Sequence, residues 1–285
     1  GPQSGPTAAL QDGGVVSVAE NGRALILNAD GSERARLGLQ GVYQTPPVIG
    51  PDGTIYIGST QAKFIYALNP DGSIRWQFSR TDQGGWFMSG AGVGPDGTVY
   101  AADDHSRAYA LDGASGQEIW SVPLEGGRGL VQVPPTVDDN GTIYFATDQG
   151  YVHALNPNGT SKWTYDTGQG QAIRHSPIAG ATGLVYTVAG TELFALDAAS
   201  GYPHYQFTAG SDILAQPALG ADGSLYLAAH GKTLYGLNPD GALRFEYVPN
   251  GNLTFETTPT LAPDGGQVYV AARQKKLFAV DTASG

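Results

Sequence analysis

The stretch "GPDGTIYIGSTQAKFIYALNPDGSIRW" occupies residues 50–76, and close copies of it occupy residues 94–120 and 138–163. Each copy begins with a Gly-containing turn, continues into an alternating strand such as "TIYIG", and reaches a second strand that ends in Leu-Asn or Leu-Asp. Apolar residues at every second position predict β-strands, and Asp-Gly or Asn-Gly steps predict tight turns. The stretch is therefore one antiparallel unit that the chain repeats.

The whole chain consists of such units. The tyrosine of the first strand, with a valine in the first copy, returns at intervals of 40, 44, 44, 42, 40 and 43 residues, at Val16, Tyr56, Tyr100, Tyr144, Tyr186, Tyr226 and Tyr269. A short Pro-led segment precedes each unit and a third, often aromatic, strand follows, which gives four strands per unit. Four short antiparallel strands in about 40 residues are typical of one propeller blade. We therefore predict an all-β fold, a seven-bladed β-propeller of four-stranded antiparallel blades.

The repeats also predict the boundaries. Residues 1–5 resemble the remnant of a cleaved tag followed by a linker, so we expect a piece of a larger parent protein. Residues 6–285 form a single propeller domain, whose blades we place at about 6–40, 45–80, 90–123, 133–166, 176–208, 216–248 and 258–285. Because the last copy stops where its outer strand would begin, we expect the seventh blade to lack this strand in the given chain; the alternative is that the strand lies in a part of the parent protein outside it.

Composition narrows the possible partners. The net charge is −11, which argues against general affinity for nucleic acid or for an anionic membrane surface. The chain has no cysteine, which excludes disulfides, thiolate metal sites and a cysteine nucleophile. No apolar run approaches the roughly 18 residues of a transmembrane helix, so we expect no direct membrane insertion of this fragment.

A family resemblance rests on "YALDGASGQEIW" (109–120) and its counterparts. The order Gly-x-(Val/Ile)-Tyr, Ala-Leu-Asp, Gly and then Trp is similar to the PQQ-like propeller repeat, and all seven units match it in part. The Trp is present as Trp76, Trp120 and Trp163; we assign Tyr205 and Phe245 to its place in later copies and Arg36 in the first. We expect these aromatic residues to pack between neighbouring blades.

The resemblance implies three kinds of relative. They are the PQQ-dependent alcohol dehydrogenases, the propeller lipoprotein of the outer-membrane barrel assembly machine, and the sensor domains of bacterial receptors, including membrane Ser/Thr kinases. The dehydrogenase is the least favoured of the three, because the resemblance would require a vicinal disulfide, eight blades and a Ca²⁺ ligand set. We assign no catalytic residue and no metal ligand to this chain. We predict a non-catalytic propeller.

Candidate binding residues lie in the loops between the second and third strands and in the connections between blades. In such a blade these loops share one side, which we call the connection face. Its candidate ligand-binding residues are Lys63, Trp86, Arg107, Arg128, Arg174, His175, Lys232 and Arg273. Guanidinium and ammonium groups bind carboxylates by charge-assisted hydrogen bonds, so a small anionic ligand is expected, and PQQ, a tricarboxylate, is one possibility.

The segment "RTDQGGWFMSG" (80–90) contains a Trp-Phe-Met run that falls outside the repeat. Trp86, Phe87 and Met88 are therefore candidate anchors for a protein partner, because aromatic residues on loops often dominate such contacts. The alternative is that this loop folds its own aromatic side chains over the propeller.

The opposite side, which we call the turn face, carries the Asp-Gly and Asn/Asp-x-x-Gly turns. Asp52, Asp71, Asp96, Asp222 and Asp264 belong to it. We interpret these aspartates as turn formers, and we expect few basic residues to oppose them. The histidines His105, His153, His204 and His230 are scattered without metal-ligand spacing.

Two functions remain open at this point. The first is a ligand-binding sensor domain of an extracytoplasmic receptor, plausibly the PQQ-sensing part of a membrane Ser/Thr kinase. The alternative is a protein–protein interaction scaffold of the outer-membrane assembly type, with another envelope protein as partner. Both place the domain on the periplasmic or extracellular side of a bacterial membrane, with a membrane-anchored parent.

Overall fold

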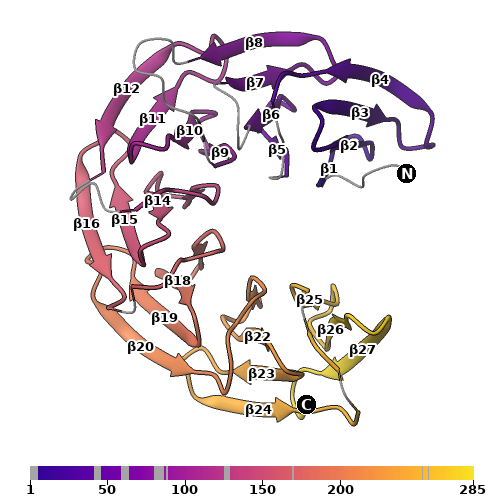
Figure 1. The fold of residues 1–285 in the computed structure, drawn as a ribbon, viewed down its shortest axis with the longest axis vertical. Helices are drawn as coiled ribbons and strands as arrows, with labels where there is room; N and C mark the ends of the chain where they lie inside the picture. Colours follow the sequence, from indigo (N-terminus) through magenta and orange to yellow (C-terminus); the bar gives the residue numbers. More distant parts are fainter. Residues whose placement is uncertain are drawn as a thin grey trace. The chain divides into compact units, whose positions relative to one another are not determined.

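The computed structural model describes residues 6–41, 46–58, 64–79, 87, 89–124, 129–168, 170–251, 253–255 and 257–285. All regular elements of these residues are β-strands, arranged in six four-stranded sheets and one three-stranded sheet (Figure 1). Every pairing is antiparallel between neighbours in sequence, so the chain is a seven-bladed β-propeller. In this part of the chain no helix is long and apolar enough to cross a membrane.

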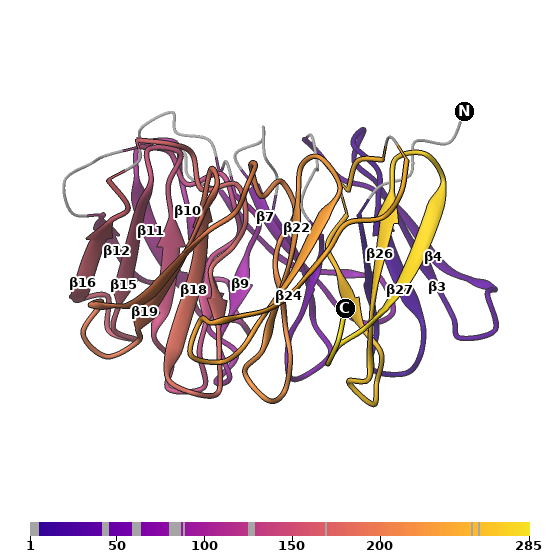
Figure 2. The same ribbon diagram turned by 90° about the horizontal axis from the view of Figure 1, so that it is seen from below.

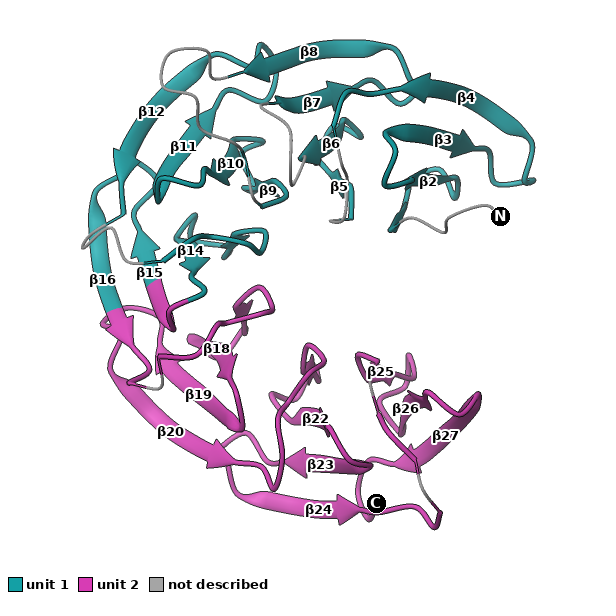
Figure 3. Cartoon of the chain, in the orientation of Figure 1, with its two compact units in different colours: residues 1–148, 153–164 teal, residues 149–152, 165–285 magenta. Residues whose placement is uncertain are grey.

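The chain forms two compact units (Figure 3), residues 1–148 with 153–164 and residues 149–152 with 165–285. The first three sheets belong to the first unit and the last three to the second, and the boundary passes through the fourth sheet. Seen side-on in Figure 2, the strands of a sheet run lengthwise and the turns and connections gather at their ends.

The first three sheets have the same succession of a short inner strand and three longer ones. The first sheet contains β1 (Thr7–Ala9), β2 (Val15–Val18), β3 (Arg23–Leu27) and β4 (Glu33–Gly38). The second contains β5 (Val48–Ile49), β6 (Ile55–Gly58), β7 (Phe64–Leu68) and β8 (Ile74–Ser79). The third contains β9 (Gly92–Val93), β10 (Val99–Ala102), β11 (Arg107–Leu111) and β12 (Glu118–Pro123).

The remaining sheets repeat this order. The fourth contains β13 (Thr136–Val137), β14 (Ile143–Ala146), β15 (Tyr151–Leu155) and β16 (Ser161–Asp166). The fifth contains β17 (Ile178–Ala179), β18 (Leu184–Ala189), β19 (Glu192–Asp197) and β20 (Pro203–Thr208). The sixth contains β21 (Ala218–Leu219), β22 (Leu225–Ala229), β23 (Thr233–Leu237) and β24 (Leu243–Tyr247). The seventh has β25 (Thr260–Leu261), β26 (Gln267–Ala272) and β27 (Lys276–Asp281), and thus lacks the outer strand, as predicted.

The core lies between successive sheets. The middle strands β6, β10, β14 and β22 are buried at every position, because both faces of the sheet are covered. One apolar cluster joins Val16 and Ile26 of the first sheet to Ile57 of the second, and another joins Leu193 of the fifth to Leu227 of the sixth. The outer strands β8 and β24 have one buried position each, because the core lies on the inner strands.

The turn-face aspartates hold their own turns. The carboxylates of Asp52, Asp96, Asp222 and Asp264 each accept the backbone N–H two residues further on, at 3.0 Å. In the Asn-Pro-Asp-Gly turn, Asp71 Oδ1 accepts both the N–H and the hydroxyl of Ser73. These bonds lower the pKa of Asp71. The interpretation of these aspartates as turn formers is confirmed.

An aromatic residue of one sheet packs on a glycine of the next. A Cβ placed on Gly116 would lie 2.6 Å from the Trp76 indole, and one on Gly159 would lie 2.8 Å from the Trp120 indole. The indole nitrogens donate to backbone carbonyls of the same turns, Trp76 to Gly113 and Trp120 to Pro157, each at 2.8 Å. The predicted packing of these aromatic residues between neighbouring blades is confirmed for these pairs.

The first copy was aligned wrongly at this place. The residue that meets the next glycine is Ala35, which pairs with Ile26 and whose Cβ lies 2.4 Å from a Cβ built on Gly72. Arg36 is exposed and forms a 2.6 Å ion pair with Glu33. The error of one residue arose because Ala35 is not aromatic, so the first copy has no ring to mark the register.

Basic residues of the outer strands reach the turn face, contrary to the expectation that few oppose its aspartates. Arg34 forms a 2.6 Å ion pair with Asp12, and Arg75 forms a 2.7 Å pair with Asp52. Arg244 donates to Asn238 Oδ1 at 2.8 Å, to Ser224 Oγ at 2.7 Å and to the Thr282 carbonyl at 3.2 Å. Because Thr282 belongs to the next repeat, the bond from Arg244 to its carbonyl ties consecutive blades together.

Replacing Arg244 by methionine should therefore destabilise the protein by about 2 kcal/mol, because it leaves partly buried acceptors without a donor. Urea unfolding measures the loss. Arg36→Met is the matched control: its ion pair with Glu33 is exposed, so its effect should stay within about 0.5 kcal/mol. Equal effects of the two substitutions would contradict a stabilising role for the Arg244 bonds.

Candidate functional site

The connections between blades share a feature that the repeat pattern did not reveal. A large apolar residue stands in the connection, five residues before the first residue of the inner strand that follows. In five connections this residue is described and buried: Phe87, Val131, Ile173, Ile213 and Phe255. Phe87 and Phe255 even form equivalent isolated bridges, to Asp103 and Ala272. Each of these connections is thus attached to the core by one buried side chain, and we call these five residues the pins.

Phe87 is one of these pins, so the structure does not support it as an exposed partner anchor. Its side chain is 1% exposed and its ring lies 5.6 Å from that of Tyr109 and 6.0 Å from that of Phe78. The sequence hypothesis treated the Trp-Phe-Met run as outside the repeat, whereas Phe87 occupies a repeated position. Trp86 and Met88 lie outside the described residues.

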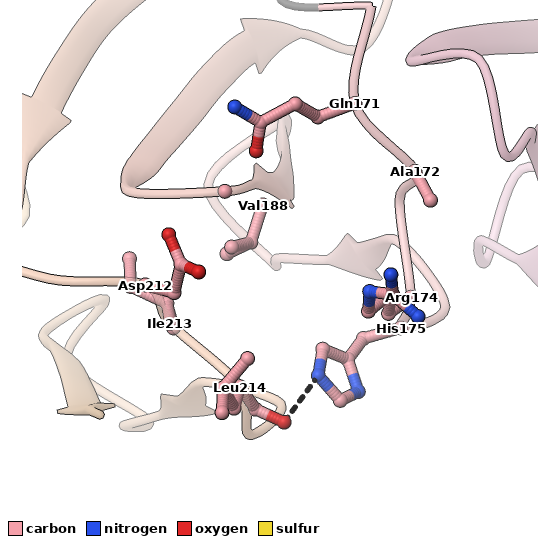
Figure 4. Close-up of a pocket in the computed structure, with 9 residues that line it drawn as sticks. Gln171, Ala172, Arg174, His175, Val188, Asp212, Ile213 and Leu214 are labelled. Carbon is pink, nitrogen blue, oxygen red and sulfur yellow. Dashed lines mark hydrogen bonds between the residues drawn. The ribbon is translucent and has the colours of Figure 1, made fainter.

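The residues that flank two successive pins line a cavity of about 250 Å³ in the second unit (Figure 4). Ala172 and Arg174 flank Ile173, and Asp212 and Leu214 flank Ile213; all four line the cavity. Ile213 itself, Val188 of β18, Gly190, Gln171 and His175 complete the lining.

Hydrogen bonds hold the two connections in place. His175 Nε2 lies 2.9 Å from the Leu214 carbonyl oxygen, which joins one connection to the next. The Ile213 N–H donates to the Gly190 carbonyl at 2.9 Å, which fixes the second connection to the β18–β19 turn. The Gln171 carboxamide lies over Gly190, because a Cβ built there would meet its oxygen. The walls of the cavity are therefore preformed.

The charges in the cavity come from Arg174 and Asp212, which lie on opposite sides of Val188 in Figure 4. Both side chains are exposed, and within the described residues neither makes a hydrogen bond or an ion pair. Burial lowers the pKa of His175, and the positive charge of Arg174 lowers it further, although the bond to Leu214 opposes them. Since a carbonyl oxygen only accepts, Nε2 of the neutral ring carries the hydrogen.

The other predicted ligand residues that the structure describes do not line this cavity. Arg107 Nη2 donates to the carbonyl and the hydroxyl of Ser121, at 3.0 and 3.2 Å, on the neighbouring strand β12. Lys232 Nζ donates to the Gly251 carbonyl at 3.3 Å. Arg273 is exposed and does not line the cavity, and Lys63 and Arg128 lie outside the described residues. Among the predicted residues with a described position, only Arg174 and His175 are brought together here.

A second group of polar residues, Asp103, Asp104 and His105, places three possible metal-ligand atoms close together. Asp103 is buried, however, and its carboxylate already accepts the N–H groups of His105 and Arg107 and the Tyr109 hydroxyl. His105 Nδ1 lies 2.8 Å from Asp104. These bonds show that the three residues stabilise the β10–β11 turn.

PQQ is a poor match for the Arg174 cavity. A tricarboxylate needs several cationic partners, whereas this cavity pairs one guanidinium with the Asp212 carboxylate, which repels anions. We derive no role for PQQ at this place, and PQQ binding elsewhere on the chain stays a prediction.

Sequence reasoning found Arg174 and His175 but missed their partners across the cavity. Asp212 and Leu214 stand in the next connection at the same places as Ala172 and Arg174. The available signal was the spacing to the residue just before the inner strand, which is Pro135, Pro177, Pro217 and Pro259 in four connections and Ala91 in another. This spacing is hard to recognise in the sequence because the pins are Phe, Val or Ile, and the property they share is burial.

Comparison with known proteins supports the fold and gives a family. The model of a family described as outer membrane protein assembly factor BamB matches residues 61–181 and 148–285. The crystal structure of BamB from Moraxella catarrhalis is similar, with a TM-score of 0.73 and 17% identity over 97% of this chain and 83% of that one. A streptogramin B lyase structure is also similar, with a TM-score of 0.71 and 15% identity over 98% of this chain and 94% of that one. No curated protein matches significantly in sequence.

Proposed function

The chain belongs to the family of outer membrane protein assembly factor BamB, and on this premise we propose that it binds other proteins of the bacterial envelope rather than catalysing a reaction. The observation that carries the proposal is the match of the family model, which extends across residues 61–285. The alternative considered from the sequence, a protein–protein interaction scaffold, thereby becomes the preferred function. A periplasmic or envelope location agrees with it, and a membrane-anchored parent is part of the proposal.

The connection face is the surface that we propose for partner contact. The buried residue repeats, while the exposed residue that follows Val131, Ile173 and Ile213 is Gln132, Arg174 and Leu214, respectively. A surface that varies on a repeated scaffold suits recognition, because recognition residues are placed on a fold separately from those that build it. Leu214 and Val248 add exposed apolar surface on this face, at 38% and 47% exposure.

Site-specific photo-crosslinking in cells of the source organism tests this proposal. A photoreactive residue at Leu214 should form adducts with components of the outer-membrane assembly machinery, identified by mass spectrometry. The same residue at Asp240, which is exposed in a turn of the opposite face of the same unit, should not. Adducts only from Asp240, or none with an envelope assembly protein, would overturn the proposal.

The receptor-kinase hypothesis stays a prediction, since it rests on the resemblance of the repeat alone. The dehydrogenase alternative has the same basis. The non-catalytic assignment is likewise a proposal. The non-catalytic assignment is supported by polar side chains such as Asp103 and Arg107, which form hydrogen bonds with residues of their own sheet.

A further inference from the structure

The cavity between the connections 171–175 and 212–214 combines three features that a small ligand requires. It has an apolar base, formed by Val188 and Ile213, both of which belong to the core cluster between the fifth and sixth sheets. It has walls fixed by the His175–Leu214 and Ile213–Gly190 hydrogen bonds. It has two opposite charges, on Arg174 and Asp212, that are not used within the described fold.

We propose that this cavity binds a small aliphatic zwitterion of the size and charge of a free α-amino acid. The Arg174 guanidinium is the partner of its carboxylate, because the planar fork of donors matches two carboxylate oxygens. The Asp212 carboxylate accepts hydrogen bonds from its ammonium group. An aliphatic side chain covers Leu214, which lines the cavity and is 38% exposed, and this contact removes apolar surface from water.

Charge and size favour this ligand over others. A simple anion would meet the Asp212 carboxylate, and a simple cation would meet the Arg174 guanidinium; a zwitterion satisfies both. The volume of about 250 Å³ holds a molecule of roughly amino-acid size but is small for a drug-sized or cofactor-sized ligand, whose pockets are about 300–1,000 Å³. The inference concerns a small molecule and does not depend on the proposed protein partner.

Calorimetric titration of L-leucine into the purified chain is the experiment that tests it. Because both charged side chains are exposed, we expect a dissociation constant on the order of 1 mM or below. Leucinamide lacks the carboxylate and N-acetylleucine lacks the ammonium group, so each should bind at least about ten-fold more weakly, the loss of one charged partner.

Arg174→Gln and Asp212→Asn should each weaken leucine binding at least about ten-fold. Arg273→Gln and Asp240→Asn are the matched controls: they remove the same charges from exposed residues that do not line the cavity, and should leave the affinity unchanged. Thermal melts of all four variants should match that of the parent protein, because the changed side chains are exposed.

Three results would overturn the proposal. The first is the absence of leucine binding at millimolar concentrations. The second is equal binding of leucine and N-acetylleucine, which would indicate a site for plain carboxylates. The third is unchanged affinity in Arg174→Gln or Asp212→Asn. None of these results bears on the crosslinks at Leu214, so the two proposals can fail separately.

Discussion

Replacing Gly116 by alanine is expected to lower the free energy of unfolding by about 3 kcal/mol, because the substitution adds backbone strain and overpacks the junction of two blades. Gly116 has φ +73°, a conformation that L side chains rarely adopt. The new Cβ would also lie 2.6 Å from the Trp76 indole, which is itself fixed by its bond to the Gly113 carbonyl. The ring cannot move without breaking that bond.

Gly97→Ala separates the two causes. Gly97 has φ +84° but no atom within 4 Å of an added Cβ, so its substitution should cost only the strain of about 1 kcal/mol. Urea unfolding of both variants gives the difference. In a Trp76→Ala background, Gly116→Ala should cost no more than Gly97→Ala. A penalty that persists without the indole would show that the close contact is not the cause.

Acidification from pH 7 to pH 5 is expected to destabilise the protein by about 2 kcal/mol through His153 alone. The side chain of His153 is 1% exposed on β15, and burial lowers its pKa to about 4. In the unfolded chain the pKa returns to about 6.5. Between these values the unfolded chain binds a proton that the folded chain does not, so stability falls as the pH drops through 6.5 and stops falling below about 4.

His153→Phe should flatten this dependence. The equivalent residue of the fifth sheet is Phe194, so the site suits an aromatic ring. Urea unfolding at pH 7 and pH 5 compares the two proteins in a range above the pKa values of the turn aspartates. A titration of the His153 ring by NMR that showed protonation near pH 6.5 in the folded protein would contradict the prediction.

The repeat made the fold predictable from the sequence, because tyrosines and Leu-Asp endings return at nearly equal intervals. Alignment of the repeats failed at positions where one copy has a residue of a different chemical type from the others. Ala35 takes the place of a Trp, and the register of the first copy was lost with the ring. Phe87 looked unique beside Trp86, although Val131 and Ile173 fill the same place in other connections.

The candidate site was only half predictable. Arg174 and His175 stood out because their loop departs from the repeat, whereas Asp212 lies 38 residues further along and meets them only through the packing of two connections. Contacts between an outer strand and the next repeat, such as the bond of Arg244 to the Thr282 carbonyl, were hidden for the same reason. A repeat pattern reports what the copies share, and these contacts depend on which side chains two neighbouring copies happen to combine.

The packing of an aromatic ring on the next glycine has a consequence for the history of the gene. The repeat 77–120 offers a glycine to the copy before it and a ring to the copy after it, namely Gly116 and Trp120. A copy inserted by unequal recombination would therefore bring a glycine for the ring of the preceding copy and a ring for the glycine of the following copy. If a copy were lost, the ring before it would meet the glycine after it. The junction between the first and second repeats is the exception, because Ala35 takes the place of the ring that meets Gly72. The first repeat therefore does not carry the ring that an exchange of copies would need.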